Sequence, residues 1–231
     1  MMDLTNRVVL ITGAKGGLGS AVTQAFLDAG AVVVGTSRTI SASDFAHKRF
    51  HAMPEDLADG GAVARLAGAV VERFAKIDSL IHVAGGFAGG TPIHETDDAT
   101  WDGMMNLNAG AAFHVLRAVI PHMRRAGRGS IVAIGSRAGV EPVANLAAYN
   151  ASKAALLSLV RTAALENRDA RITANVILPG TIDTASNRAS DPAGNHAQWI
   201  APERLAALAL FLASDAGAQI TGAAIPVYGF Q

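Results

Sequence analysis

The chain has 231 residues, half of them hydrophobic and 16% charged, which is typical of an ordinary globular protein with one sizeable core. Lys plus Arg and Asp plus Glu each number 19, so charge does not favour nucleic acid as a partner. Cysteine is absent, which excludes disulfides, zinc–thiolate sites and cysteine nucleophiles. With no signal-peptide pattern and no apolar run of roughly 18 residues, we expect a cytoplasmic protein that forms a single domain over 1–231, with no metal site and no membrane partner.

The first predicted element leads directly into a glycine-rich turn. Val8–Ile11 is continuously apolar and largely β-branched, which is typical of a strand buried on both faces of a parallel sheet. The turn Thr12–Gly19 and a helical pattern that ends near Gly30 follow. This order of elements sets backbone N–H groups and a helix N-terminus against a pyrophosphate. We predict a dinucleotide site; the alternative is a glycine-rich turn without a ligand. The cofactor contacts expected in this turn are Gly13, Lys15, Gly17, Leu18 and Gly19.

The second predicted strand, 31–36, ends at Ser37 and Arg38. In dinucleotide folds an acidic residue at this point binds the ribose 2′-OH and favours NAD. No carboxylate is present here, whereas Arg38 and the nearby Lys15 can form charge-assisted hydrogen bonds with a 2′-phosphate. We therefore predict NADP(H) as the cofactor, with Ser37 and Arg38 among its contacts. The alternative is that both cations are solvated loop residues.

The central part of the chain repeats the same pattern. A short strand at 49–52 and a helix at 61–74 precede a buried strand at 79–84. That strand ends in Gly85 and Gly86, and glycines at a carboxyl edge let a ligand approach the backbone. His82 lies within the strand, where we expect a satisfied core histidine.

The second half continues the alternation of strands and helices. A helical region is predicted at 100–126, interrupted at Gly110 and Pro121. Asn108 lies inside it, where an asparagine usually points to solvent. The remaining predicted elements are strands at 130–135, 172–178 and 223–227, helices at 146–167 and 202–213, and a polar substrate loop or lid at about 185–200. The alternation predicts an α/β fold with a doubly wound parallel β-sheet of the Rossmann type, flanked by helices on both faces.

Tyr149 and Lys153 are four positions apart on a predicted helix, so they share one face. A nearby ammonium favours a phenolate and is expected to lower the pKa of Tyr149 from about 10 towards neutrality. Such a phenol can donate or accept a proton at physiological pH. Ser136 follows the strand at 130–135 and would hydrogen-bond the same substrate oxygen. On its own, this Tyr-x-x-x-Lys spacing also occurs by chance on many helices.

Taken together, these motifs resemble the short-chain dehydrogenases/reductases, in the branch with shorter chains, over essentially the whole length. The resemblance rests on Thr12-Gly13-x-x-x-Gly17-x-Gly19, Asp56-Leu57, Trp101 followed by Asn108-Ala109-Gly110, Ser136 with Tyr149 and Lys153, and Pro179-Gly180-x-Ile182-x-Thr184. It implies a catalytic tetrad of Asn108, Ser136, Tyr149 and Lys153. Tyr149 would be the general acid in reduction or the base in oxidation, and Ser136 would polarise the substrate oxygen. Lys153 would also bind the nicotinamide ribose, and Asn108 would hold a water of a proton relay.

The resemblance implies further cofactor contacts: Asp56 and Leu57 at the adenine, Ala84, Gly85 and Gly86 at the strand edge, and Pro179, Gly180, Ile182 and Thr184 on the nicotinamide side. One departure is the segment His82-Val83-Ala84-Gly85, where the family has Asn-Asn-Ala-Gly, so local hydrogen bonding must differ. Candidate substrate contacts, by position only, are Phe87, Arg137, Val140, Asn145, Ile182 and Trp199. His94 is a further candidate, since it and Arg137 would attract an acidic substrate, but the favoured interpretation of both is a solvated loop side chain.

The leading hypothesis is an NADP(H)-dependent oxidoreductase acting on a small-molecule carbonyl or alcohol. One alternative is an NAD-dependent alcohol dehydrogenase with NAD(H) as cofactor, if Arg38 points to solvent. Another is a dinucleotide-sensing protein without turnover, which the complete tetrad argues against. Sugar-nucleotide epimerases share the Tyr-x-x-x-Lys pair but are usually longer. The family usually forms homotetramers or dimers through the two long helices, so a homo-oligomer is expected.

Overall fold

Seven parallel strands form one sheet in the order β3-β2-β1-β4-β5-β6-β7, in a computed structural model that describes residues 2–229. The strands are β1 (Val8–Thr12), β2 (Val32–Thr36), β3 (Phe50–Ala52), β4 (Ser79–His82), β5 (Gly129–Ile134), β6 (Ile172–Pro179) and β7 (Ala224–Val227). The predicted doubly wound parallel sheet is confirmed, and the strands lie within one or two residues of their expected positions.

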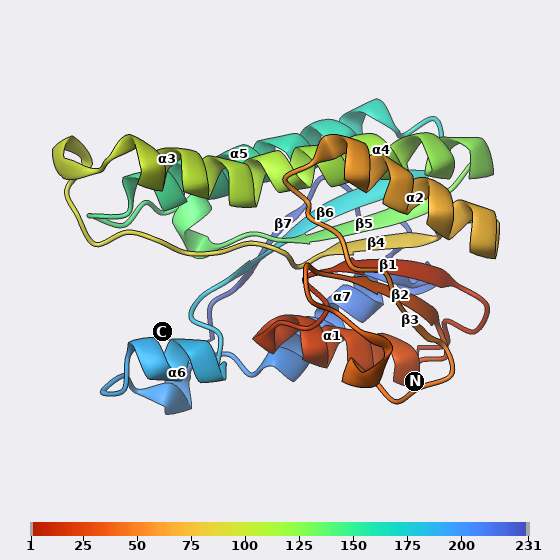
Figure 1. The fold of residues 1–231 in the computed structure, drawn as a ribbon, viewed down its shortest axis with the longest axis horizontal. Helices are drawn as coiled ribbons and strands as arrows, with labels where there is room; N and C mark the ends of the chain where they lie inside the picture. The colour runs from red at the N-terminus through yellow and green to blue at the C-terminus, as the bar shows by residue number, and fades with distance from the viewer. Residues whose placement is uncertain (1, 230–231) are drawn as a thin grey trace.

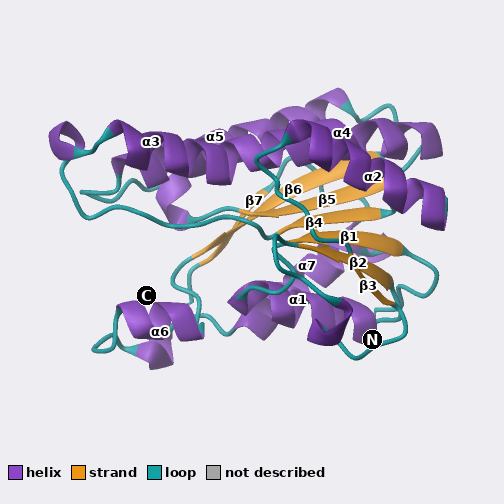
Figure 2. Ribbon diagram, in the orientation of Figure 1, coloured by secondary structure: helices purple, strands orange, loops and turns teal. Residues whose placement is uncertain are grey.

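Helices cover both faces of the sheet, as Figure 1 and Figure 2 show. One face carries α2 (Gly60–Phe74), α4 (Ala111–Ala126) and α5 (Ala147–Glu166), and the other carries α1 (Gly17–Asp28) and α7 (Pro202–Ala213). Successive residues of β1 alternate between the two cores. Val8 and Leu10 pack towards α2, α4 and α5, whereas Val9 and Ile11 pack towards α1 and α7. A strand that is buried on both faces therefore needs the continuous apolar run that its sequence shows.

The strand order reverses beside β1, and this reversal positions the candidate site. The chain moves from β1 to β2 and β3 on one side and then returns to β4 on the other. In parallel sheets such a switch point opens a crevice at the carboxyl ends of the strands. The glycine turn after β1 and the glycine edge after β4 therefore lie side by side.

The helical region at 100–126 differs from its prediction. It consists of α3 (Asp98–Met104), a π-helical segment Met105–Gly110 and then α4. The break includes the predicted Gly110, at which the π-helical segment ends, but α4 runs through Pro121 without interruption. Pro121 lies on an exposed face, where water can bond the carbonyl group that a proline leaves without a donor.

The segment 185–200 also differs from the predicted polar loop. It contains a short helix, α6 (Ala185–Ser190), and a 3-10 turn, His196–Gln198. The Thr184 hydroxyl caps α6 by accepting the Asn187 N–H at 3.2 Å, and Arg188 forms an ion pair with Asp183. Local capping and one ion pair thus give structure to a segment that its polar composition marked as a loop.

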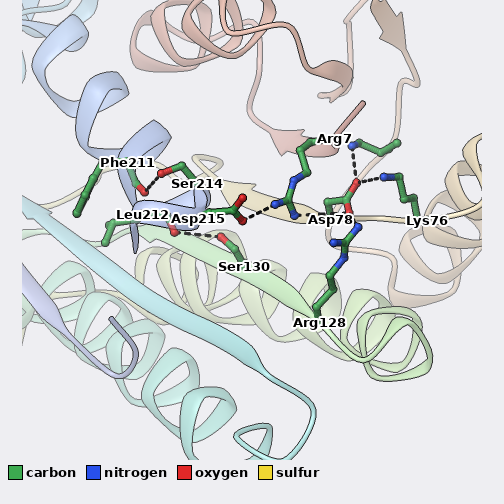
Figure 3. A network of polar contacts seen from close by, with 10 residues as sticks. Arg7, Lys76, Asp78, Arg128, Ser130, Phe211, Leu212, Ser214 and Asp215 are labelled. Atoms are coloured by element: carbon green, nitrogen blue, oxygen red, sulfur yellow. Dashed lines mark hydrogen bonds and ion pairs between the residues drawn. The ribbon is translucent and has the colours of Figure 1, made fainter. Parts of the chain in front are cut away.

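A buried carboxylate ties together the amino-terminal ends of the strands, at the edge opposite the crevice (Figure 3). Asp78, directly before β4, is 5% exposed and accepts the Val8 N–H at 2.8 Å. Its three cationic neighbours are Lys76 (Nζ–Oδ2, 2.8 Å), Arg128 (Nη2–Oδ1, 3.2 Å) and Arg7 (Nη1–Oδ1, 4.0 Å). Arg7 also pairs with Asp215 beyond α7. The network connects the starts of β1, β4 and β5 to the end of α7.

Within residues 2–229, no helix is both long enough and apolar enough to cross a bilayer.

Candidate active site

A cleft of about 1370 Å³ opens at the carboxyl ends of the strands. Its volume exceeds the roughly 300–1,000 Å³ of a pocket for one drug-sized ligand, so it can hold a dinucleotide and a second small molecule. Of the predicted catalytic and cofactor-binding residues, Thr184 and Asn108 lie outside its lining. Those that line it are Gly13, Lys15, Gly17, Leu18, Gly19, Ser37, Arg38, Asp56, Leu57, Ala84, Gly85, Gly86, Ser136, Tyr149, Lys153, Pro179, Gly180 and Ile182.

The glycine turn after β1 is packed so closely that side chains are excluded. Gly13 has a φ of +65°, and a Cβ there would lie 2.8 Å from the Ala84 nitrogen. A Cβ on Gly19 would lie 1.9 Å from the Gly13 carbonyl oxygen, and one on Gly17 would lie 2.9 Å from the Thr184 side chain. The glycines therefore let α1 start directly against the strand, so that its N-terminus lies at the cleft. Thr184 supports this turn from outside the cleft lining.

Two further features of the cleft fit a phosphate-bearing dinucleotide. The N-cap of α1, Gly16, has no side-chain capping bond, so the first N–H groups of the helix are available to an anion. The Ser37 hydroxyl is buried at the end of β2 with no hydrogen-bond partner in the part of the chain that the structure describes. A buried hydroxyl without a partner is costly, and a ribose or phosphate oxygen would satisfy it. The residues present thus fit the predicted cofactor.

Two cationic residues line the cleft where β2 ends and the glycine turn begins, Arg38 and Lys15, and their environments differ. Arg38 is exposed and makes no ion pair or hydrogen bond with the described residues. Lys15 is engaged, because its Nζ lies 3.1 Å from Asp44 Oδ1 and donates to the Thr39 carbonyl at 3.1 Å. The sequence shows no carboxylate at the end of β2, but the fold brings one to Lys15 from the turn before β3.

Ser136, Tyr149 and Lys153 meet on the wall of the cleft below the glycine edge of β4. Ser136 follows β5, accepts the Ala138 N–H at 3.2 Å and lies close enough to the Tyr149 hydroxyl to lower the pKa of that phenol. Lys153 is buried, its Nζ donates to the Ile134 carbonyl at 3.3 Å, and it lies 5.9 Å from the centre of the Tyr149 ring. Two hydroxyl groups and one buried ammonium therefore line the same part of the cleft.

The pKa of Tyr149 does not shift in the direction that its spacing from Lys153 suggested. Burial raises the pKa of the phenol, and the hydrogen bond with Ser136 opposes this only in part. Burial also lowers the pKa of Lys153 to about 8. Both shifts have one cause, since a poorly hydrated site disfavours the charged form of either group. Within this chain alone, Tyr149 is therefore held as a neutral phenol.

Asn108 is fully buried, contrary to the expectation that a helical asparagine points to solvent. Its Oδ1 accepts the Gly86 N–H at 3.0 Å, and its Nδ2 donates to the Gly86 carbonyl at 3.2 Å and to the Ser152 hydroxyl at 3.0 Å. The π-helical segment turns this side chain inward. Asn108 thus fixes the glycine edge of β4 to the helix that carries Tyr149.

His82 is buried, as expected, but only one of its ring nitrogens is bonded. Thr12 Oγ1 accepts the Ala84 N–H at 3.2 Å and lies 2.9 Å from His82 Nδ1. This contact engages Nδ1 and leaves the second ring nitrogen, Nε2. That nitrogen has no partner within residues 2–229. Burial, together with the charge of Lys153, lowers the pKa of His82 to about 3, so the ring is neutral.

The substrate side of the cleft is only partly the one predicted. Phe87, Arg137, Ile182 and Trp199 line it, and the Phe87 ring meets the Tyr149 ring edge-on at 5.0 Å. The other three candidates, His94, Val140 and Asn145, do not line it. Sequence reasoning missed Val143 and Leu146, which do. Leu146 precedes Tyr149 by three positions, the spacing of neighbours on one helical face, and this signal was available.

Comparisons with known proteins agree with this arrangement. A family model described as short chain dehydrogenase matches residues 7–194. A rhamnolipids biosynthesis 3-oxoacyl-(acyl-carrier-protein) reductase from Pseudomonas aeruginosa is 34% identical, over 98% of this chain and 96% of the relative. A 2,3-dihydro-2,3-dihydroxybenzoate dehydrogenase from Escherichia coli is 31% identical, over 95% and 94% of the two chains.

The same agreement extends to solved structures. An active-site complex of Pseudomonas aeruginosa RhlG with NADP has a TM-score of 0.89 at 31% identity, over 99% of this chain and 97% of that one. A family match over most of the length, relatives above 30% identity and the shared fold lead to one conclusion. The chain belongs to the short-chain dehydrogenase family of oxidoreductases.

Proposed function

We propose that this protein is an NADP(H)-dependent oxidoreductase that transfers hydride between the nicotinamide and a carbonyl or secondary-alcohol substrate. The observation that carries the proposal is the meeting of Ser136, Tyr149 and buried Lys153 on one wall of the cleft. When bound, the nicotinamide supplies or accepts the hydride. The protein's part is to hold both molecules, exclude water and move one proton.

Each part of the cleft has a proposed role in holding the cofactor. Asp56 and Leu57 would contact the adenine, and the start of α1 with Gly13, Gly17, Leu18 and Gly19 would hold the pyrophosphate. Ser37, Arg38 and Lys15 would surround the adenosine ribose and its phosphate. Ala84, Gly85 and Gly86 would border the cofactor along the edge of β4. The nicotinamide side is assigned to Pro179, Gly180, Ile182 and Thr184, with Tyr149 and Lys153 at the ribose.

Tyr149 acts as the general acid when a carbonyl is reduced. Negative charge develops on the substrate oxygen, and the hydroxyl groups of Tyr149 and Ser136 can both donate to it. Because burial raises the pKa of Tyr149, the phenol holds its proton at neutral pH, and this is the protonation state that a general acid needs. Lys153 supplies a positive charge behind the phenol, and Asn108 holds the glycine edge in place.

The decisive experiment replaces one hydroxyl. Tyr149→Phe should abolish turnover across a carbonyl panel while NADPH binding, followed by fluorescence, changes little. The chain offers a matched control, because Tyr228 is its only other tyrosine and does not line the cleft. Tyr228→Phe should keep turnover. Substantial activity in Tyr149→Phe would show that another group is the acid. Tight NADPH binding with no turnover by the wild-type protein would instead favour the non-catalytic, dinucleotide-sensing alternative.

The preference for NADP(H) is supported by Arg38, which is exposed at the cleft and free to meet a 2′-phosphate. It is also supported by the NADP complex of a relative with the same fold. The pairing of Lys15 with Asp44 favours the NAD(H) alternative, because it withdraws one cation. Parallel titrations with NADPH and NADH distinguish the two. Arg38→Asp should weaken NADPH more than NADH; an equal effect on both would exclude the phosphate contact.

The substrate binds near Tyr149, where Phe87 packs against the phenol ring. Other apolar side chains that line the cleft are Val143, Leu146 and Trp199. The segment 185–200 borders the same space through Ser186, Asn187, Ser190 and Asp191, and we assign it the role of substrate lid. The named substrates of the two relatives differ, which is why we propose a reaction type and not a compound.

A homo-oligomer is part of the proposal. Exposed apolar side chains occur on the helical layer that contains α4 and α5, namely Trp101, Leu107, Phe113 and Leu165. A dimer or tetramer formed through these helices would cover them. Light scattering behind size exclusion measures the mass directly, and a monomer of 23.7 kDa would exclude this part.

A further inference from the structure

The turn between β2 and β3 carries a carboxylate that pairs with Lys15, one of the residues that line the cleft. Asp44 ends the 3-10 turn Ala42–Asp44, and its two oxygens lie 3.1 and 3.3 Å from Lys15 Nζ. The same carboxylate accepts the Ser41 N–H at 2.7 Å and the Ser41 hydroxyl at 3.1 Å. Its side chain is only 22% exposed, so the turn holds it in place against Lys15. The ion pair is thus a fixed feature of this end of the cleft.

We propose that Asp44 is a specificity-determining residue that weakens the binding of a 2′-phosphate by neutralising Lys15. This inference rests on the proposed NADP(H) function. Two cations, Lys15 and Arg38, line this end of the cleft, and a phosphate dianion there would interact with both. With Asp44 attached to Lys15, only Arg38 is uncompensated, and the carboxylate adds repulsion for the dianion. A 2′-hydroxyl has no charge, so the charge of Asp44 would not weaken the binding of NADH in this way.

The contacts of Lys15 show how the residue is occupied. An ammonium has three donors, and Lys15 directs one to the Thr39 carbonyl and at least one to Asp44. Asp44→Asn can keep the oxygen that accepts the Ser41 N–H, so the turn retains its cap. The retained Oδ2 would keep its contact of 3.3 Å with Lys15 Nζ, but the amide nitrogen would replace Oδ1, which lies 3.1 Å from Nζ. The variant therefore removes the negative charge and the closer of the two contacts, which leaves the charge of Lys15 uncompensated. The substitution therefore separates the charge of Asp44 from its structural role.

The test is fluorescence titration of the purified protein with NADPH and with NADH. Because the Lys15–Asp44 pair is partly exposed, Asp44→Asn should tighten NADPH about two- to fivefold, the range expected for such pairs, and leave NADH unchanged. Asp28→Asn, an exposed carboxylate at the far end of α1, controls for the change in net charge. In the Asp44→Asn background, Lys15→Met should cost more NADPH affinity than it does in the wild-type protein.

The opposite result would overturn the inference. Weaker NADPH binding in Asp44→Asn would mean that Asp44 orients Lys15 towards the phosphate, and an unchanged ratio of the two affinities would mean that Asp44 has no role. Failure of the proposed function is a different observation, since it appears in the wild-type protein as tighter NADH binding. Even then, a shift of the affinity ratio towards NADPH in Asp44→Asn would support the role of Asp44.

Discussion

Lys153 is expected to destabilise the folded protein at neutral pH, and its removal should show by how much. Burial lowers the pKa of its ammonium from 10.5 to about 8. The difference of about 2.5 pH units corresponds to roughly 3 kcal/mol of unfolding free energy at about 1.4 kcal/mol per unit. Between pH 8 and 10.5 the unfolded chain binds more protons than the folded chain, so stability rises with pH in this window. Below pH 8 the full cost of burying the charge is present.

The assay is urea unfolding of the wild-type protein and of Lys153→Met at several pH values from 7 to 10.5. The variant should be more stable at pH 7 by up to about 3 kcal/mol, reduced by the loss of the bond to the Ile134 carbonyl. The stability advantage of Lys153→Met over the wild-type protein should shrink as the pH rises above 8. Tyrosine side chains also titrate in this range, but they do so in both proteins. Lys48→Met is the control, because Lys48 is exposed. A stability difference that does not vary with pH would refute the reasoning.

Two further predictions concern buried polar groups. His82 has a pKa lowered from 6.5 to about 3 by burial and by Lys153, so the stability of the wild-type protein should fall as pH drops from 6.5 towards 3. His82→Asn, which keeps a polar partner for the Thr12 hydroxyl, should unfold at a lower pH in acid titrations followed by circular dichroism. An unchanged midpoint would contradict a neutral His82 ring. Asp78→Ala should cost about 3 kcal/mol in urea unfolding, because it removes the carboxylate that three cations and the Val8 N–H share. Asp215→Ala should change the free energy of unfolding little, because the Asp215 side chain is 89% exposed. Equal losses of unfolding free energy in both variants would show that the burial of Asp78 does not increase its contribution to stability.

Local sequence patterns were sufficient for the fold and for much of the cleft. The apolar run of β1, the glycine turn and the spacing of Tyr149 and Lys153 each depend on residues close together in the chain. Parallel strands then bring their carboxyl ends to one edge, which is why residues chosen from separate motifs line one cleft.

The parts that sequence reasoning missed depend on tertiary environment. Asn108 is turned inward by a π-helical segment whose geometry has no sequence signature. The pKa of Tyr149 depends on burial, which spacing alone does not reveal. Lys76 lies two positions from Asp78, but Arg7 and Arg128, and Asp44 as the partner of Lys15, come from distant parts of the chain that no local pattern connects. Charge pairs of this kind become visible only when the chain is folded.

The strand order has a consequence for the speed of folding. Adjacent β1 and β4 are brought together by residues as far apart as Val8 and Asp78, 70 positions along the chain. A chain emerging from the ribosome can form β1, α1 and β2 early, but the centre of the sheet cannot close until β4 is available. Parallel pairing with such separations belongs to the slow class of folding topologies. Until then the apolar edge of β1 remains uncovered, which makes the interval before β4 pairs the one in which the chain is most prone to aggregate.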